Sequence, residues 1–254
     1  MPTERLCVCV DLDDTLGSSA GKYVLADAKC TLLLIETLGW HSPSLIDIVG
    51  LHDRIDCELI PEFGWTHKRY TLGWVRTYQH LCRKAGLSPD QRIVEELTSI
   101  VAAVQWPFGK EDLVPGARET LVQLQQAGHE LRLVTIGEEH IQVPKLYSLG
   151  LLDFFAEKRI HCTTVKEGGK GAVFGRLLER PDALPIVMVG NSLVNDIMPA
   201  LELRQSAIHV PCPVVWTAER PSEMPRGHWT ARTITEVPDI VRRIVAGERP
   251  SEAA

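Results

Sequence analysis

The stretch Val8-Cys9-Val10-Asp11-Leu12-Asp13-Asp14-Thr15-Leu16 decides the interpretation of this sequence. The apolar run from Leu6 to Val10 predicts a buried strand of about five residues, and it ends directly in carboxylates. Like charges at such a position repel one another, and burial adds the cost of lost hydration. A divalent cation such as Mg2+ relieves this cost, because it prefers carboxylate and carbonyl oxygens. Ligands bind at the carboxyl ends of strands in open α/β sheets, so Asp11 and Asp13 are candidates for a nucleophile and metal site. The alternative interpretation of this stretch is a strand followed by an ordinary polar turn that has no role in catalysis or metal binding.

Composition excludes several classes of protein. The chain has 254 residues, 44% of them hydrophobic and 24% charged, which is typical of a globular protein of one large or two modest domains. The net charge of -6 argues against a general nucleic-acid binder. No apolar stretch approaches the ~18 residues of a membrane span, and we expect no signal peptide. The seven cysteines form no C-x-x-C pair, and Cys7 and Cys9 are expected to be small buried side chains on one face of the strand. We therefore expect a cytoplasmic protein without membrane or nucleic-acid partners.

From Val114 onward, strand and helix signals alternate along the chain. This alternation predicts an α/β fold, a doubly wound parallel sheet with helices on both faces. Strands are predicted over 130–135, 159–165, 184–189 and 207–210. One helix is predicted to begin at 115–119 and another to lie between 137 and 150. Further helices are predicted over 171–179, 196–203 and 237–246. Residues 247–254 are polar and are expected to be a disordered tail.

Residues 17–112 do not alternate in this way. Helical patterns over 23–38, 70–85 and 90–104 predict an all-helical insert, folded over the strand ends as a cap domain. The sheet domain would then be discontinuous and consist of residues 1–16 and 113–254.

Three further polar signals follow predicted strands or open predicted helices. Thr135 and the backbone of Ile136 end one strand, where a hydroxyl and free N–H groups can hold phosphate oxygens. Either Lys166 or Lys170 could neutralise the carboxylates. A third signal is the stretch Gly190-Asn191-Ser192-Leu-Val-Asn195-Asp196. Taken singly, these signals also fit a helix cap, a solvated lysine and an ordinary turn.

Taken in order, the four signals resemble the four motifs of the haloacid dehalogenase superfamily of hydrolases. The resemblance covers nearly the whole predicted sheet domain, and the helical insert resembles that superfamily's cap. It rests on Asp11-Leu-Asp13-Asp-Thr15-Leu16, on Thr135-Ile-Gly137 followed by Gln142 and Lys145-Leu146, on the lysine, and on Gly190-Asn191-Ser192 with Asp196.

The resemblance implies a Mg2+-dependent phosphomonoester hydrolase acting on a small organic phosphate. Asp11 would be the nucleophile that forms an aspartyl-phosphate, and Asp13 the acid that protonates the leaving group and later activates water. Asp196 would position the lysine or complete the metal shell. The remaining implied roles are phosphate binding by Thr135 and Ile136, charge balance by Lys170 with Lys166 as the fallback, and metal binding by Asp11, Asp13, Asn191 and Asp196.

One residue departs from the superfamily's pattern, because the fourth motif commonly begins Gly-Asp and here reads Gly190-Asn191. An amide oxygen still ligates Mg2+, but it carries no negative charge. Two alternatives stay open: a dehalogenase, against which Asp13 argues because a halide leaves without a proton, and a non-catalytic protein that kept the fold. Substrate choice would lie in the insert, where Trp65-Thr-His67-Lys68-Arg69 and Trp74 offer stacking and charge or simply pack, and at a rim that includes His209, 211–213 and Trp216.

Overall fold

The computed structural model describes residues 5–105 and 108–250, and the chain divides into two compact units. Unit 1 comprises Met1–Ser18 and Phe108–Ala254, and unit 2 comprises Ser19–Pro107. These boundaries lie a few residues inside the predicted insert of 17–112. The difference arises because the two segments that connect the units bond to each other as part of unit 1. The Ser18 amide of one segment donates to the Asp112 carbonyl of the other over 2.7 Å.

Unit 1 is built on a six-stranded sheet in which every neighbouring pair is parallel, in the order β3-β2-β1-β4-β5-β6. The strands are β1 (Cys7–Val10), β2 (Glu130–Ile136), β3 (Ile160–Thr163), β4 (Ile186–Gly190), β5 (Ser206–His209) and β6 (Trp229–Thr230). Strand β1 lies between β2 and β4, where the strand order reverses direction. This switch point is the place where open α/β sheets bind ligands.

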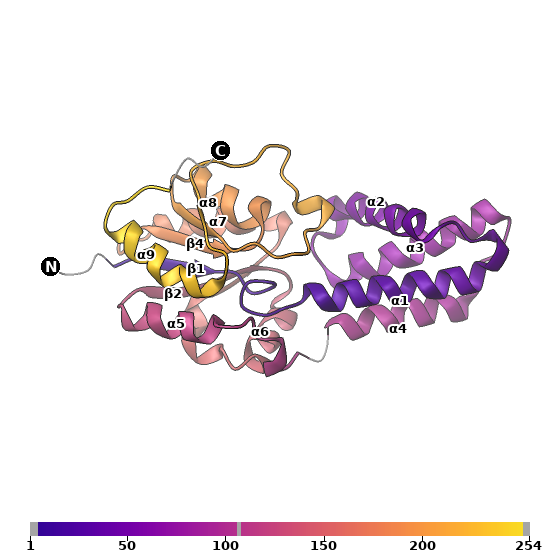
Figure 1. Cartoon of the computed structure of the whole chain (residues 1–254), viewed down its shortest axis with the longest axis horizontal. Coiled ribbons are helices and arrows are strands. Elements are labelled where there is room, and N and C mark those ends of the chain that lie inside the picture. Colours follow the sequence, from indigo (N-terminus) through magenta and orange to yellow (C-terminus); the bar gives the residue numbers. More distant parts are fainter. Residues whose placement is uncertain (1–4, 106–107, 251–254) are drawn as a thin grey trace. The chain divides into compact units, whose positions relative to one another are not determined.

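Helices cover both faces of the sheet, which confirms the predicted doubly wound fold (Figure 1). These helices are α5 (Ala117–Gln126), α6 (Glu139–Ser148), α7 (Gly169–Leu178), α8 (Met198–Glu202) and α9 (Val237–Val245). On one face, Val8 and Val10 of β1 share an apolar core with α5, α6 and α9. On the other face, Cys7 and Cys9 pack in a core with α7 and α8. The two sulfur atoms lie 3.8 Å apart, as expected for residues that alternate along a strand.

Two details of unit 1 differ from the sequence-based expectation. The edge strand β6 was not predicted, because two residues are too few to show a periodic pattern. The helix expected from residue 196 begins earlier, as a π-helical turn at Leu193–Ile197 that continues into α8. In the predicted tail, the Gly247 and Glu248 amides bond to the last turn of α9, and residues 251–254 lie outside the described residues.

The described part of unit 2, residues 19–105, contains four α-helices that pack side by side (Figure 1). They are α1 (Ala20–Leu38), α2 (Leu45–Phe63), α3 (His67–Ala85) and α4 (Gln91–Gln105). The sequence predicted α1, α3 and α4 but not α2. The buried face of α2 includes His52 and Asp56 at helical spacing with Ile48 and Leu59, so polar residues interrupt its apolar stripe. No helix in the described part of the chain is long and apolar enough to cross a membrane.

The interior of unit 2 contains an unusual buried histidine. His52 stacks on Trp74, with ring centroids 3.9 Å apart, and its Nε2 lies 3.9 Å from the Asp27 carboxylate. Burial lowers the pKa of His52 to about 3, and Arg69 acts in the same direction. His52 is therefore neutral in the folded protein at pH 5, whereas it is charged in the unfolded chain.

Replacing His52 with phenylalanine should make the protein less sensitive to acid. The pKa of His52 is lower in the folded protein than in the unfolded chain. The contribution of His52 to the free energy of unfolding is therefore fully present above about pH 6.5 and is lost as the pH falls. At pH 5 the loss amounts to about 2 kcal/mol relative to pH 7.5. Urea unfolding of both proteins at the two pH values measures this difference. A loss of the same size in both proteins would contradict the prediction.

Candidate active site

The sequence-predicted site residues follow three adjacent strands of unit 1. Asp11 comes directly after β1, Thr135 and Ile136 end β2, and Asn191 comes directly after β4. Both β2 and β4 are hydrogen-bonded neighbours of β1, and the strands are parallel. The three motifs therefore lie at one edge of the sheet, as the sequence predicted.

A tight turn follows Asp11 and fixes the direction of the chain. The amides of Leu16 and Gly17 both donate to the Leu12 carbonyl over 2.9 Å, and Asp14 has the left-handed φ of 59°. The Thr15 hydroxyl then donates to Asn191 Oδ1 over 3.3 Å. This bond connects the first motif to the end of β4.

Lys170 joins the two buried carboxylates of the site. It is the second residue of α7, and its Nζ donates to Oδ1 of both Asp11 and Asp196. All three residues are buried, with 6% of Asp11, 3% of Lys170 and 0% of Asp196 exposed. Lys166, the other candidate, lies in the preceding turn and is exposed, without an ion pair within the described residues. The structure thus brings Lys170, and not Lys166, to the carboxylates.

The electrostatics of this cluster disfavour the ionised form of Asp11. Burial raises the pKa of Asp11 to about 8; the Lys170 ammonium opposes the rise, and the Asp196 carboxylate adds to it. Burial also disfavours the charge on Lys170, but Asp11 and Asp196 outweigh this effect and raise the lysine's pKa. A cation beside Asp11 would favour the ionised carboxylate that a nucleophile needs.

Asp196 serves as an anchor for the lysine. Its Oδ2 accepts the Ser192 amide over 2.8 Å, while Oδ1 accepts from Lys170. Gly190 makes this placement possible, because a Cβ at that position would lie 2.2 Å from Asp196 Oδ2. The sequence left two roles open for Asp196, which are positioning the lysine and completing the metal shell. The structure contains the contact with Lys170 that the first role requires.

Asp13 is held by two side chains from α6. Lys145 Nζ lies 2.9 and 3.2 Å from the two carboxylate oxygens, and Gln142 Nε2 donates to Oδ2 over 2.9 Å. Gln142 and Lys145 follow Thr135-Ile-Gly137 in the second motif, and the resemblance implied no role for either of them. They lie 129 and 132 residues from Asp13 in sequence, so no local pattern could have paired them.

Thr135 is buried at the end of β2, where its Oγ1 accepts a weak bond from Gln142 Nε2 over 3.4 Å. Because the hydroxyl acts as acceptor there, its own hydrogen can still be donated. Directly after β4, Asn191 is partly exposed, and its main-chain carbonyl contacts His209 Nε2 at 3.0 Å. His209, the last residue of β5, therefore contacts the fourth motif, and a rim formed by it with 211–213 and Trp216 stays a prediction.

The candidate specificity residues of unit 2 are mostly packed within that unit. Trp74 is fully buried, and Arg69 forms a buried ion pair with Asp56. The Arg69 guanidinium also lies 4.9 Å from the centre of the Trp65 ring. In the structure, Trp74, Arg69 and Trp65 therefore pack within unit 2, which is the alternative to substrate binding that the sequence left open.

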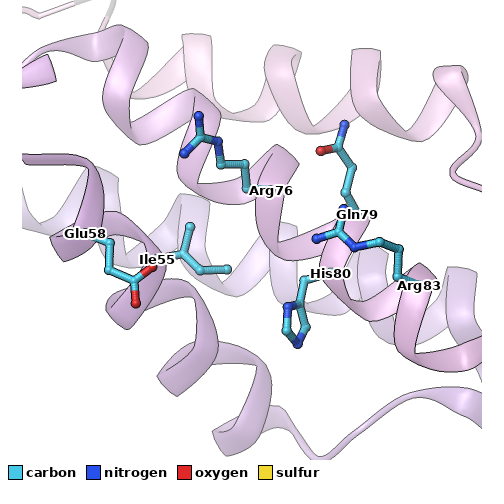
Figure 2. A pocket seen from close by; sticks show the side chains of 6 residues that line it. All are labelled: Ile55, Glu58, Arg76, Gln79, His80 and Arg83. Carbon is cyan, nitrogen blue, oxygen red and sulfur yellow. The ribbon is translucent and has the colours of Figure 1, made fainter. Parts of the chain in front are cut away.

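A pocket in unit 2 lies on α2 and α3, with polar and charged side chains around it (Figure 2). It is lined by Ile55, Glu58, Arg76, Gln79, His80 and Arg83. None of the sequence-predicted catalytic residues is among them.

The donors near Asp11 fit a hard cation in chemical type. The Asp11 carboxylate, the Asp13 carbonyl and the Asn191 amide oxygen are all oxygen ligands of the kind that Mg2+ takes. Within residues 5–105 and 108–250, no group of three His, Cys, Asp or Glu is arranged to hold a metal ion. Of the four predicted metal-binding residues, Asn191 offers an amide oxygen and Asp13 a main-chain carbonyl, which are outside that class of ligands, and Asp196 is already bonded to Lys170 and the Ser192 amide.

Comparison with known proteins places these features in a family. A family model described as haloacid dehalogenase-like hydrolase matches residues 6–203, which include every predicted catalytic, phosphate-binding and metal-binding residue. The chain belongs to the haloacid dehalogenase-like hydrolases. Membership in this hydrolase family confirms the resemblance predicted from the four motifs.

Individual haloacid dehalogenase-like relatives resemble much of the chain. A glyceraldehyde 3-phosphate phosphatase of Methanopyrus kandleri is 30% identical over 193 residues, which cover 75% of this chain and 77% of the relative. A haloacid dehalogenase-like hydrolase of Xanthomonas campestris superposes with a TM-score of 0.73 at 24% identity, over 96% of this chain and 98% of the other. The magnesium-bound YfnB hydrolase of Bacillus subtilis gives a TM-score of 0.59 at 20% identity, over 94% and 99%. At these identities, the two structures show a shared fold.

Proposed function

We propose that this hydrolase cleaves phosphate monoesters of small organic molecules through an aspartyl-phosphate at Asp11. The observation that carries the proposal is the buried Asp11–Lys170–Asp196 cluster, with the acid Asp13 two residues further along the same turn. The phosphatase activity named for the Methanopyrus kandleri relative supports it. We also retain the prediction that unit 2 is the cap that selects the substrate.

In the proposed reaction, Asp11 attacks phosphorus and the bond from phosphorus to the leaving oxygen breaks. Asp13, as the carboxylic acid, gives its proton to that oxygen. Asp13 then takes a proton from a water molecule, which attacks the phosphorus and releases Asp11 and inorganic phosphate. The Thr135 hydroxyl and the Ile136 amide would donate to the phosphate oxygens, and Lys170 would keep Asp11 in place.

The residues near Asp11 also suit Mg2+, which we propose as the cofactor. Asp11, the Asp13 carbonyl and Asn191 would hold it. Asp196, which accepts a hydrogen bond from Lys170, would add a further negative charge near the ion. When bound, the ion supplies positive charge that offsets the negative charge on the phosphoryl group. The magnesium-bound Bacillus subtilis neighbour supports this choice of ion.

Three assays on the purified chain test the proposed function. p-Nitrophenyl phosphate should be hydrolysed with Mg2+ and not with EDTA, and glyceraldehyde 3-phosphate should be tested beside it because the relative is named for it. Release of halide from 2-chloropropionate would indicate the dehalogenase alternative, which needs no acid such as Asp13. Absence of turnover on all three compounds would overturn the proposal in favour of a non-catalytic protein.

Replacing Asn191 with aspartate should tighten binding of Mg2+. The change adds a full negative charge to a site of hard oxygen donors, and the charge of the ligands helps to set affinity. We expect the dissociation constant for Mg2+ to fall by about tenfold, as roughly 1.4 kcal/mol of added attraction would give. Calorimetric titration with Mg2+ alone measures it without substrate.

Thr15 offers a matched control for the Asn191 variant, because its hydroxyl donates to Asn191 Oδ1. In Thr15→Val this bond is lost while the charge is unchanged, so the affinity for Mg2+ should change far less. An unchanged or weaker affinity in Asn191→Asp would show that residue 191 does not contact the ion.

A further inference from the structure

The contacts around Asp13 identify two residues that the proposed mechanism has not yet used. We propose that Gln142 and Lys145 are positioning residues that orient the Asp13 carboxyl group toward the leaving oxygen. The inference rests on the proposed function, since it assigns a role within the same reaction. It concerns residues of unit 1 alone.

Geometry supports a positioning role for Lys145. Its Nζ contacts both oxygens of Asp13, at 2.9 and 3.2 Å, so the carboxylate cannot turn away from α6 without losing this contact. The lysine itself is only 5% exposed, and its ammonium lies 4.9 Å from the centre of the Phe108 ring. Asp13 is the more accessible partner, with 30% of its side chain exposed. The pair therefore has a buried inner member and an accessible outer one, as a positioned acid requires.

Gln142 connects the acid to the phosphate-binding strand. Its Nε2 donates to Asp13 Oδ2 over 2.9 Å and to the Ile136 carbonyl over 3.0 Å, and it lies 3.4 Å from Thr135 Oγ1. One amide group thus fixes the acid relative to the two residues proposed to bind the phosphate. Gly137 leaves room for it, since a Cβ there would lie 2.6 Å from Gln142 Nε2.

Stability alone does not explain these two side chains. Gln142 is 3% exposed, and its Oε1 has no hydrogen-bond partner within the described residues, which is a cost to the folded state. The Lys145–Asp13 ion pair is partly buried, and the hydration that its charges lose offsets much of their attraction. Both features are expected where a protein holds a reactive group in a set direction.

The expected signature is a loss that depends on the leaving group. Lys145→Met should lower kcat on glycerol 3-phosphate by about 10- to 100-fold, because an alkoxide needs a well-placed proton donor. On p-nitrophenyl phosphate, whose leaving group is weakly basic, kcat should fall less than about threefold. Gln142→Leu should show the same pattern, and Lys145→Arg, which keeps charge and donors, should recover part of the activity on the alkyl ester.

A double-mutant cycle ties the effect to Asp13. Asp13→Asn should itself slow the alkyl ester far more than the aryl ester, and adding Lys145→Met to it should cause little further loss, because the group to be positioned is gone. The exposed Lys158 provides a matched control, and Lys158→Met should leave both rates unchanged. Circular dichroism of each variant checks that the fold is retained.

The outcomes separate the two proposals. Equal losses on both esters, or fully additive losses in the double mutant, would overturn the positioning role while the phosphatase function stands. If the wild-type chain hydrolyses neither these two esters nor glyceraldehyde 3-phosphate with Mg2+ present, the proposed function fails and the positioning role fails with it.

Discussion

Replacing Asp11 with asparagine should abolish hydrolysis of phosphate esters while the fold is retained. The variant keeps the shape of the side chain but loses the carboxylate that would attack phosphorus. Loss of a nucleophile costs several powers of ten, so we expect turnover of p-nitrophenyl phosphate to fall by about 10⁴-fold or more. Steady-state assays with Mg2+ measure it, and the aspartyl-phosphate should disappear from acid-quenched samples. If the variant retains more than about a hundredth of wild-type turnover, covalent catalysis at residue 11 is wrong.

The same variant has a stability readout that does not depend on catalysis. Burial raises the pKa of Asp11 to about 8 in the metal-free protein, above its usual value near 3.8. The stability tied to this group is therefore present at low pH and is lost as the pH rises toward 8. In EDTA, the melting temperature of the wild type should fall between pH 5 and pH 8 relative to that of Asp11→Asn. Parallel curves would show that Asp11 is not electrostatically strained.

Local sequence was sufficient to predict five of the six strands of the sheet and the polar residues at the ends of its central strands. β1 is apolar throughout and is followed directly by Asp11, so its burial and its polar end are both visible in nine residues. The motifs after β2 and β4 have the same form, a buried strand followed by polar residues. Parallel pairing then brings them together without any further information.

Other features depend on contacts between residues distant in sequence. Helix α2 was not predicted because His52 and Asp56 occupy its buried face, and only neighbouring side chains such as Trp74 and Arg69 make these polar residues acceptable there. The partners of Asp13 come from α6, more than a hundred residues away. Spacing along the chain contains no signal for such contacts.

The choice between Lys166 and Lys170 had a weak local signal. Lys170 is in the first turn of α7, where the helix dipole disfavours a positive charge. A lysine at such a position therefore indicates negative charge nearby, and the structure supplies it in Asp11 and Asp196. Lys166 lies in a short exposed turn, where the dipole provides no such indication.

Lys170→Met should have the second largest effect on catalysis. The change removes the cation that holds Asp11 and Asp196, so two buried carboxylates are left without their shared partner. Removing one partner of a buried ion pair costs about 3–5 kcal/mol in stability. We expect turnover to fall by about 10³-fold, as for loss of an electrostatic contact in other active sites. Steady-state assays with Mg2+, together with urea unfolding, measure the two effects.

Two further lysine variants make this prediction specific. Lys170→Arg keeps the positive charge and should be more active and more stable than Lys170→Met, which separates charge from packing. Lys166→Met removes an exposed lysine four positions earlier and should change turnover by less than about twofold, because surface substitutions have small effects. If Lys166→Met were instead the more damaging change, the third motif would have to be assigned to Lys166. The contact of Lys170 with Asp11 and Asp196 would then be structural, and the charge that balances the phosphate would come from the turn before α7.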